Sequence, residues 1–167
     1  MKGKNFFKIV LRVISTLSTV GLLVSGVAVL FMIFLITLEV MSRKILGFST
    51  MVADEFSGYL FVVITFMGSA YTFKMGGFTR VEMIYGRFKG KGRRIVSFLI
   101  ILVALIYLVI IDYWLWVYST SSYLSGLTSI SIVQTPLYIP QVFMAIGVTL
   151  LLSEVFLELC SFFARIK

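Results

Sequence analysis

Residues 95–117 read IVSFLIILVALIYLVIIDYWLWV, a run of 23 residues in which Asp112 is the one charged side chain. The hydrocarbon core of a bilayer is about 30 Å thick, and a helix crosses it with roughly 20 apolar residues. Lipid offers the backbone no hydrogen bonds, whereas a helix satisfies its own. A strand facing lipid would alternate apolar with polar residues, which this run does not do. The run therefore predicts a transmembrane helix.

Three further apolar runs share these properties, at residues 20–39, 56–73 and 137–157. Together the four runs give the chain a mean hydropathy of +1.07, with 60% hydrophobic and 13% charged residues. A soluble domain carries about 25% charged residues. We therefore expect an all-α integral membrane protein in which residues 1–167 form a single membrane domain with four transmembrane helices.

Residues 1–19 lead into the first apolar run and have the pattern of an amphipathic helix. Apolar side chains recur there at helical spacing, whereas Lys8 and Arg12 lie four residues apart on another face. The segment is either an interfacial helix on the membrane or the start of one long, tilted helix. The first run is too long for a signal peptide and is followed by charged residues instead of a small-residue cleavage site, so we interpret it as a retained span.

Lysine and arginine are divided unevenly between the two sides of the membrane. Of the 15 cationic residues, 13 lie before the first run, within residues 74–94 or after the fourth run, and the other two are Arg43 and Lys44. By the positive-inside rule, we expect both termini and the basic loop 74–94 in the cytoplasm, and the loop 118–136 outside. Charges along membrane borders suit contacts with anionic lipids and do not indicate nucleic-acid binding.

No pattern in the sequence is typical of an enzyme or of a cofactor site. There is no histidine, a single cysteine (Cys160), no nucleophile elbow, no phosphate-binding glycine loop and no metal-ligand cluster. We therefore expect no catalytic residue, no bound metal and no cofactor.

The centres of the four runs are also free of ionisable residues. Ion-coupled transporters place such residues inside the membrane, but Val29, Thr65, Val103 and Val148 stand near the four centres. Asp112 lies about 17 residues into its run, about 26 Å from the inner edge at 1.5 Å per residue. We expect it near the outer belt of aromatic residues, so a self-sufficient ion-coupled transporter is disfavoured.

Small residues within the runs indicate where helices approach one another closely. In lipid, such residues let two backbones come together. The predicted packing positions are Gly21, Ser25, Gly68, Ser69 and Gly147.

A cluster of charges marks the outer border between the first two runs. Arg43 and Lys44 close the first run, and Asp54 and Glu55 open the second. We expect Arg43 to pair with Glu55 or with charges of a partner subunit. The alternative is an ordinary solvated hairpin, whose ion pairs contribute well under about 1 kcal/mol each.

Several short motifs follow one another across residues 20–152. They are an arginine after the first run (EVMSRKILGFS), an acidic residue opening the second run (Glu55 in ADEFSGYL), small residues late in that run (FMGSAYTFKMGG), the segment Phe78-Thr79-Arg80-Val81-Glu82, and two prolines leading into the fourth run (TPLYIPQ). In this order and topology, the chain resembles the small membrane (Q-type) subunit of tripartite ATP-independent periplasmic (TRAP) transporters. That family usually has histidine where Phe78 stands and aspartate where Glu82 stands, so a proton-linked role of that histidine does not apply here.

The resemblance implies two partners and a setting. A large multi-span subunit would carry the substrate and sodium sites, and a periplasmic substrate-binding protein would deliver the substrate, commonly an organic anion. The small subunit would be a scaffold that anchors the large subunit and contributes to docking, in a bacterial or archaeal inner membrane, without ATP.

Two other classes of membrane protein remain open. One is a self-contained small four-helix transporter or channel that acts as a homo-oligomer. The other is a membrane anchor for a redox enzyme, and the absence of histidine argues against a haem-binding anchor.

Overall fold

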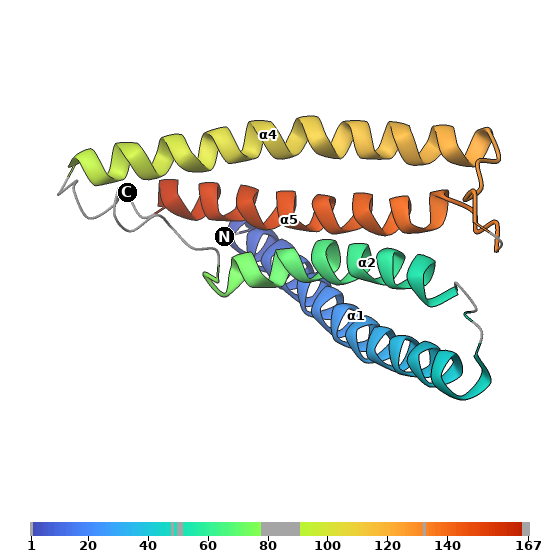
Figure 1. Cartoon of the computed structure of the whole chain (residues 1–167). Coiled ribbons are helices and arrows are strands. Elements are labelled where there is room, and N and C mark those ends of the chain that lie inside the picture. Colours follow the sequence, from blue (N-terminus) through green and yellow to red (C-terminus); the bar gives the residue numbers. More distant parts are fainter. Residues whose placement is uncertain (1, 48, 50–51, 78–90, 132, 165–167) are drawn as a thin grey trace.

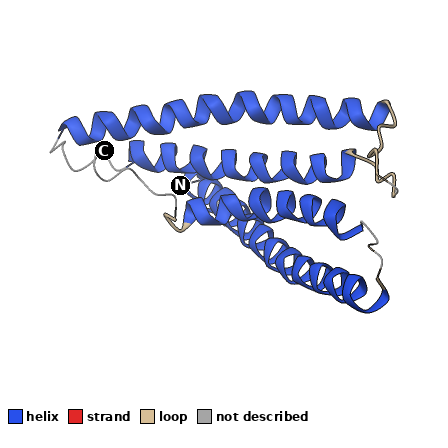
Figure 2. Cartoon of the chain, in the orientation of Figure 1, coloured by secondary structure: helices blue, strands red, loops and turns tan. Residues whose placement is uncertain are grey.

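A computed structural model of the chain describes residues 2–47, 49, 52–77, 91–131 and 133–164. This part of the chain is almost entirely helical (Figure 2). Each of its four helices contains a segment long and apolar enough to cross a membrane, which confirms the predicted all-α membrane protein. The helices are α1 (Lys2–Leu46), α2 (Val52–Lys74), α4 (Lys91–Leu124) and α5 (Tyr138–Ala164).

The predicted amphipathic lead-in and the first span form one continuous helix, α1, of 45 residues. At 1.5 Å per residue α1 is about 68 Å long, more than twice the thickness of a bilayer core. A helix of this length has to tilt or extend beyond the membrane. Figure 1 shows α1 slanting behind α2, whereas α2, α5 and α4 run side by side in that order.

Helix α4 is longer than the apolar run that predicted it. It continues through residues 118–124, which the sequence analysis assigned to the outer loop. That assignment was wrong because the serines of this stretch lie on a packed helix face: Ser119 is 3% exposed and Ser122 is 1% exposed. The loop between α4 and α5 is correspondingly short, and Tyr123 and Tyr138 at its two ends meet edge to face.

The backbone of α2 lies between two glycines, one from each neighbouring helix. A Cβ atom built on Gly21 of α1 would stand 2.6 Å from the carbonyl oxygen of Met67, and one on Gly147 of α5 would stand 2.5 Å from the carbonyl carbon of Phe66. Real Cβ atoms do not come this close to backbone atoms, so these positions require glycine. The three helices therefore cross at one level, with α2 in the middle.

Polar side chains reinforce this crossing. Ser25 of α1 donates a hydrogen bond of 2.9 Å to the carbonyl of Ile64 on α2. The Ser25 hydroxyl also lies close to Gly68 of α2, where an added Cβ atom would stand only 3.0 Å from the hydroxyl oxygen. Ser69, also predicted as a packing residue, bonds instead to the carbonyl of Phe66 in its own helix. Within a bilayer, hydroxyl bonds of this kind contribute to helix association alongside close packing.

A buried carboxyl group connects α1 with α5 further along the bundle. Ser18 of α1, which is fully buried, donates a hydrogen bond of 2.6 Å to Glu154 of α5, which is 8% exposed. On the neighbouring turn of α1, Ser15 accepts a hydrogen bond of 2.7 Å from the Lys74 ammonium of α2. The first half of α1 is thus fixed to both of the helices it crosses.

Two helices end in the same way. After α2, Gly76 has a positive φ of 71° and its amide bonds the carbonyl of Phe73, while the amide of Gly77 bonds that of Thr72. The end of α4 repeats this pattern around Gly126. These paired bonds satisfy carbonyls that the last helical turn leaves open, and the left-handed glycine makes the reversal possible.

We expect Gly147→Ala to lower the free energy of unfolding by about 1–3 kcal/mol, because the added methyl group overlaps the α2 backbone at Phe66 and overpacking costs this much. Thermal unfolding of the purified chain in detergent measures the effect. Gly26→Ala on α1 is the matched control, since a Cβ there meets nothing within 4 Å. Equal melting temperatures for the two variants would contradict the crossing described above.

Candidate functional site at the Glu55 rim

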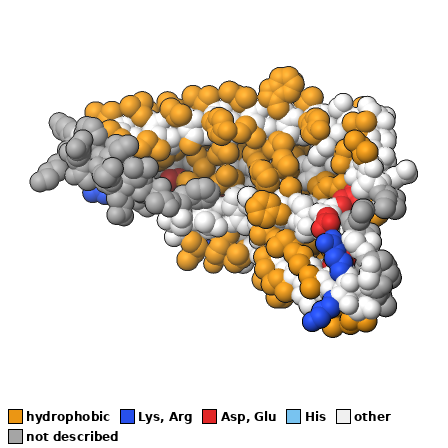
Figure 3. Space-filling view, viewed as in Figure 1, with side chains coloured by type: hydrophobic (Ala, Val, Ile, Leu, Met, Phe, Trp, Pro, Cys, Tyr) orange, Lys and Arg blue, Asp and Glu red, His pale blue; other side chains and the backbone are white. Residues whose placement is uncertain are grey.

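At one end of the bundle, the charged residues that the structure describes lie on the last turns of α1 and the first turn of α2. We call this end the Glu55 rim, and define it by Glu39, Arg43, Asp54, Glu55 and the loop 125–137. Figure 3 shows a group of charged side chains at this end and a few toward the opposite end, while hydrophobic side chains cover much of the visible surface of the helices between them. A long apolar body with a polar end is the pattern expected for helices that emerge from a membrane.

Arg43 forms two ion pairs at the rim. Its Nε lies 2.9 Å from Oε1 of Glu39, one helical turn earlier, and one of its terminal nitrogens lies 3.2 Å from Oδ2 of Asp54. Glu39 is only 7% exposed and also accepts a hydrogen bond of 2.7 Å from Ser49. Arg43 therefore neutralises a buried carboxylate and at the same time bridges α1 to the start of α2.

The expected pairing of Arg43 with Glu55 is not the one in the structure. Glu39 competes successfully because it is four residues away on the same helix, where side chains meet directly. Its burial adds to this preference, since a buried charge without a partner is costly. The predicted rim residue Lys44 lies exposed on the last turn of α1.

Glu55 instead holds the loop between α4 and α5. One of its carboxylate oxygens accepts a hydrogen bond of 2.7 Å from Tyr59, one turn along α2, and the other accepts a bond from Ser131 of the loop. Both donors are neutral hydroxyls, and a carboxylate on the first turn of α2 also suits the positive end of the helix dipole. Glu55 thus fixes the loop between α4 and α5 to the first turn of α2, which is distant from it in the sequence.

The loop itself is folded back on its own backbone. Thr128 and Pro136 form an isolated antiparallel bridge, and the amide of Leu137 bonds the carbonyl of Leu127 at 3.0 Å. At the tip of this turn Ile130 is fully exposed. The rim therefore presents an apolar side chain on a loop that Glu55 and the bridge hold in place.

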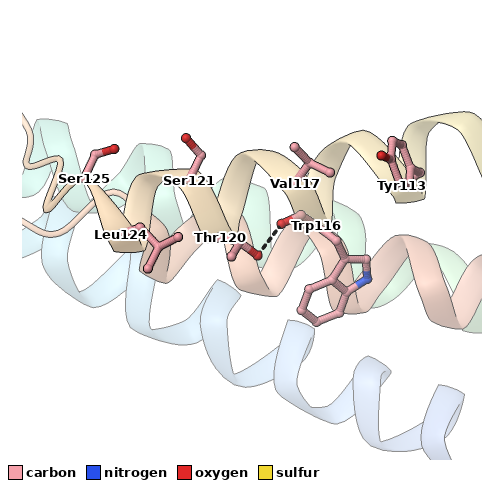
Figure 4. Close-up of a pocket in the computed structure, with 7 residues that line it drawn as sticks. All are labelled: Tyr113, Trp116, Val117, Thr120, Ser121, Leu124 and Ser125. Atoms are coloured by element: carbon pink, nitrogen blue, oxygen red, sulfur yellow. Dashed lines mark hydrogen bonds between the residues drawn. The ribbon is translucent and has the colours of Figure 1, made fainter.

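A second unusual surface lies along α4. In its most apolar window of 18 residues, none of the residues is buried, compared with 33% in α5. A shallow groove of about 550 Å³ follows its last turns, lined by residues that include Tyr113, Trp116, Thr120 and Leu124. Figure 4 shows Trp116, Thr120 and Leu124 on one side of the helix and Tyr113 on the other. Most of the apolar surface of α4 is therefore exposed, and only a smaller part is covered by α5.

One family model matches the chain over residues 32–165, which is more than half of its length. It describes the DctQ component of tripartite ATP-independent periplasmic transporters. The chain belongs to the DctQ family. No curated protein matches the chain with significance. As a DctQ protein, it is a component of a transport system of the TRAP class and a multi-pass membrane protein.

The match to the DctQ family includes the whole Glu55 rim, α2, α4 and the described part of α5. It also includes Phe78, Thr79, Arg80, Val81 and Glu82, which lie outside the described residues. The first 31 residues, including Gly21 and Ser25, precede the matched region.

Sequence reasoning missed the polar contact in the middle of the α4–α5 seam. Thr149 of α5 donates a hydrogen bond of 2.7 Å to Asp112 of α4, and the indole of Trp116 donates one of 3.1 Å to the same threonine. Asp112 was expected at the outer belt, from its distance to the basic start of α4. Asp112 and Trp116 are one helical turn apart and so lie on the same face of α4, and this spacing could have predicted that they share a polar partner.

We expect Arg43→Gln to lower the melting temperature by several degrees, because it leaves the buried Glu39 carboxylate without its cation. Lys44→Gln removes the adjacent positive charge, for which no ion pair is found in the described residues, and should change the melting temperature little. The double variant Arg43→Gln, Glu39→Gln should recover part of the loss. If Arg43→Gln and Lys44→Gln behave alike in thermal unfolding, Arg43 is only a solvated charge.

Proposed function

We propose that the chain is the small membrane subunit of a TRAP-type secondary transporter. In this proposal it scaffolds a large multi-span subunit and helps to dock a periplasmic substrate-binding protein, for sodium-coupled uptake of an organic anion. The sodium and substrate sites lie on the large subunit. The assembly lies in the cytoplasmic membrane of a bacterium or an archaeon, with the basic residues 74–94 on the inner side.

The uncovered face of α4 is the observation that carries the scaffold role. Helices α1, α2 and α5 are packed together through glycines, whereas α4 packs chiefly on α5 and keeps side chains such as Val103 and Ile110 exposed. Lipid tails can cover such a surface, but so can the helices of a larger membrane protein. Family membership favours the second, because DctQ proteins are components of a larger transport system.

The Glu55 rim supports the docking role. A docking surface for a soluble partner benefits from a preorganised shape, since ordering a loop on binding costs affinity. Here Glu55 and the backbone bridge of residues 128–136 hold the loop before any partner arrives, and Ile130 protrudes from it. An exposed apolar side chain surrounded by polar ones suits a weak, reversible contact.

The subunit role predicts that the tagged chain co-purifies with the large subunit when both are produced together, and that neither supports uptake alone in proteoliposomes. Uptake should require the large subunit, this chain and the substrate-binding protein. Transport of substrate by the chain alone, as a homo-oligomer, would contradict the proposal and favour the self-contained transporter.

The docking role predicts a kinetic effect of Ile130→Asp. A charge at this tip should raise the concentration of binding protein that gives half-maximal uptake by about tenfold, a typical cost for an interface position worth about 1.4 kcal/mol. Maximal uptake and co-purification with the large subunit should stay unchanged. Ile130→Val, which keeps the apolar surface, is the control. An unchanged dependence on binding-protein concentration in Ile130→Asp would exclude this loop from docking.

A further inference from the structure

Asp112 lies midway along the seam between α4 and α5. The rings of Tyr123 on α4 and Tyr138 on α5 meet at one end of the seam between the two helices, and Asp112 meets Thr149 further along it. Asp112 and Thr149 are each 11 residues from their tyrosine, about 16 Å at 1.5 Å per residue.

The level of Asp112 coincides with the crossing of the other helices. Its partner Thr149 is two residues beyond Gly147, which touches the α2 backbone. The carboxyl group is therefore close to the middle of the four-helix arrangement and not at its rim. Ionisable side chains inside a membrane are rare and costly, and those that occur usually have a function.

One oxygen of Asp112 is held in place by neutral donors. Thr149 lies 2.7 Å from Oδ1 and 2.9 Å from the carbonyl of Ala145, and its single proton favours the carboxylate because a charged acceptor forms the stronger bond. Trp116 donates to the threonine oxygen and fixes its orientation. Oδ2 accepts no hydrogen bond from any residue that the structure describes, and the side chain is half-buried.

Neither of the two helices that meet at Asp112 supplies a cation near it among the residues that the structure describes. Between Arg94 and the end of α4, and throughout α5, the sequence contains no lysine or arginine. Arg94 is 18 residues away, about 27 Å along the helix. Both ion pairs found among the described residues belong to Arg43, at the rim. A second copy of this chain that docked through its own α4 and α5 would likewise offer no lysine or arginine beyond Arg94.

The surface around Asp112 is apolar and open. Val109 is 47% exposed, Tyr113 64% and Trp116 42%, and the groove along the end of α4 adjoins them. Apolar surface alone does not drive helices together in lipid, since lipid tails are equally apolar. A carboxylate at the centre of that surface is what distinguishes a specific partner from lipid.

We infer that the face of α4 around Asp112 is a docking site for a transmembrane helix of the large subunit that carries a lysine or arginine at this depth. The cation pairs with the open oxygen of Asp112, while Thr149 and Trp116 hold the carboxylate toward it. This inference rests on the proposed function and adds the position and the charge of the contact.

The test measures how strongly the purified large subunit binds this chain in detergent or nanodiscs. Asp112→Asn keeps the shape and removes the charge, and we expect it to weaken binding at least tenfold. Thr149→Val, which keeps the carboxylate but removes its orienting bond, should weaken binding less. Glu158→Gln, the same chemical change near the far end of α5, is the matched control and should bind as the unmodified chain does.

The partner cation is found by neutralising each intramembrane lysine and arginine of the large subunit in turn. One neutralisation should weaken binding to the unmodified chain and cause little further loss with Asp112→Asn, which is the energetic coupling expected of a direct pair. A charge exchange, Asp112→Lys with the partner cation replaced by aspartate, should restore binding.

Each other outcome has a distinct meaning. If Asp112→Asn binds normally, or no cation couples to Asp112, the inference is wrong while the subunit role remains. If the unmodified chain does not bind the large subunit at all, the proposed function and this inference both fall. The melting temperature of isolated Asp112→Asn identifies a folding defect, and in that case the Thr149→Val result decides: unchanged binding overturns the inference.

Discussion

The close approach of the α2 backbone to Gly21 and Gly147 is the contact on which the rest of the structure depends. A lipid-facing protein gains little from burying apolar side chains, so helices are held by short interbackbone distances and a few polar bonds. Placing α2 between two glycines brings α1 and α5 to one level and leaves room for the Ser25 and Ser18 bonds. With α1, α2 and α5 packed together in this way, α4 lies at the edge of the bundle and has α5 as its main neighbour.

Polar groups inside the described part are mostly satisfied within the chain. Glu154 takes a hydrogen bond from Ser18, Glu39 is paired with Arg43, and Glu55 is bonded by Tyr59 and Ser131. Each of these bonds fixes one helix or loop to another. Asp112 is different, because its open oxygen lies beside the least covered helix of the bundle. These internal bonds therefore hold the helices and the loop together, whereas the open oxygen of Asp112 lies where we propose that a partner binds.

The sequence predicted the four membrane-spanning helices found in the described residues, because the length of an apolar run directly reflects the thickness of a membrane. Small residues also indicated close approaches at Gly21 and Gly147. Of the two partners expected for Arg43, Glu55 is not the one found, because Glu39 lies four residues earlier on the same helix and meets it directly. The partner of Asp112 was not predicted, because the register between α4 and α5 places it opposite Thr149. Register between helices depends on packing, which a single span does not reveal.

Site-directed spin labelling along α4 tests the scaffold account most directly. Single cysteines from Leu99 to Tyr113, in a Cys160→Ser background, report the access of oxygen from lipid to each position. The account predicts that adding the large subunit lowers this access along a stripe at helical spacing that includes Val109 and Tyr113, and leaves the remaining positions unchanged. Unaltered access at every position of α4, in a complex shown to be assembled, would contradict the claim that this helix carries the partner.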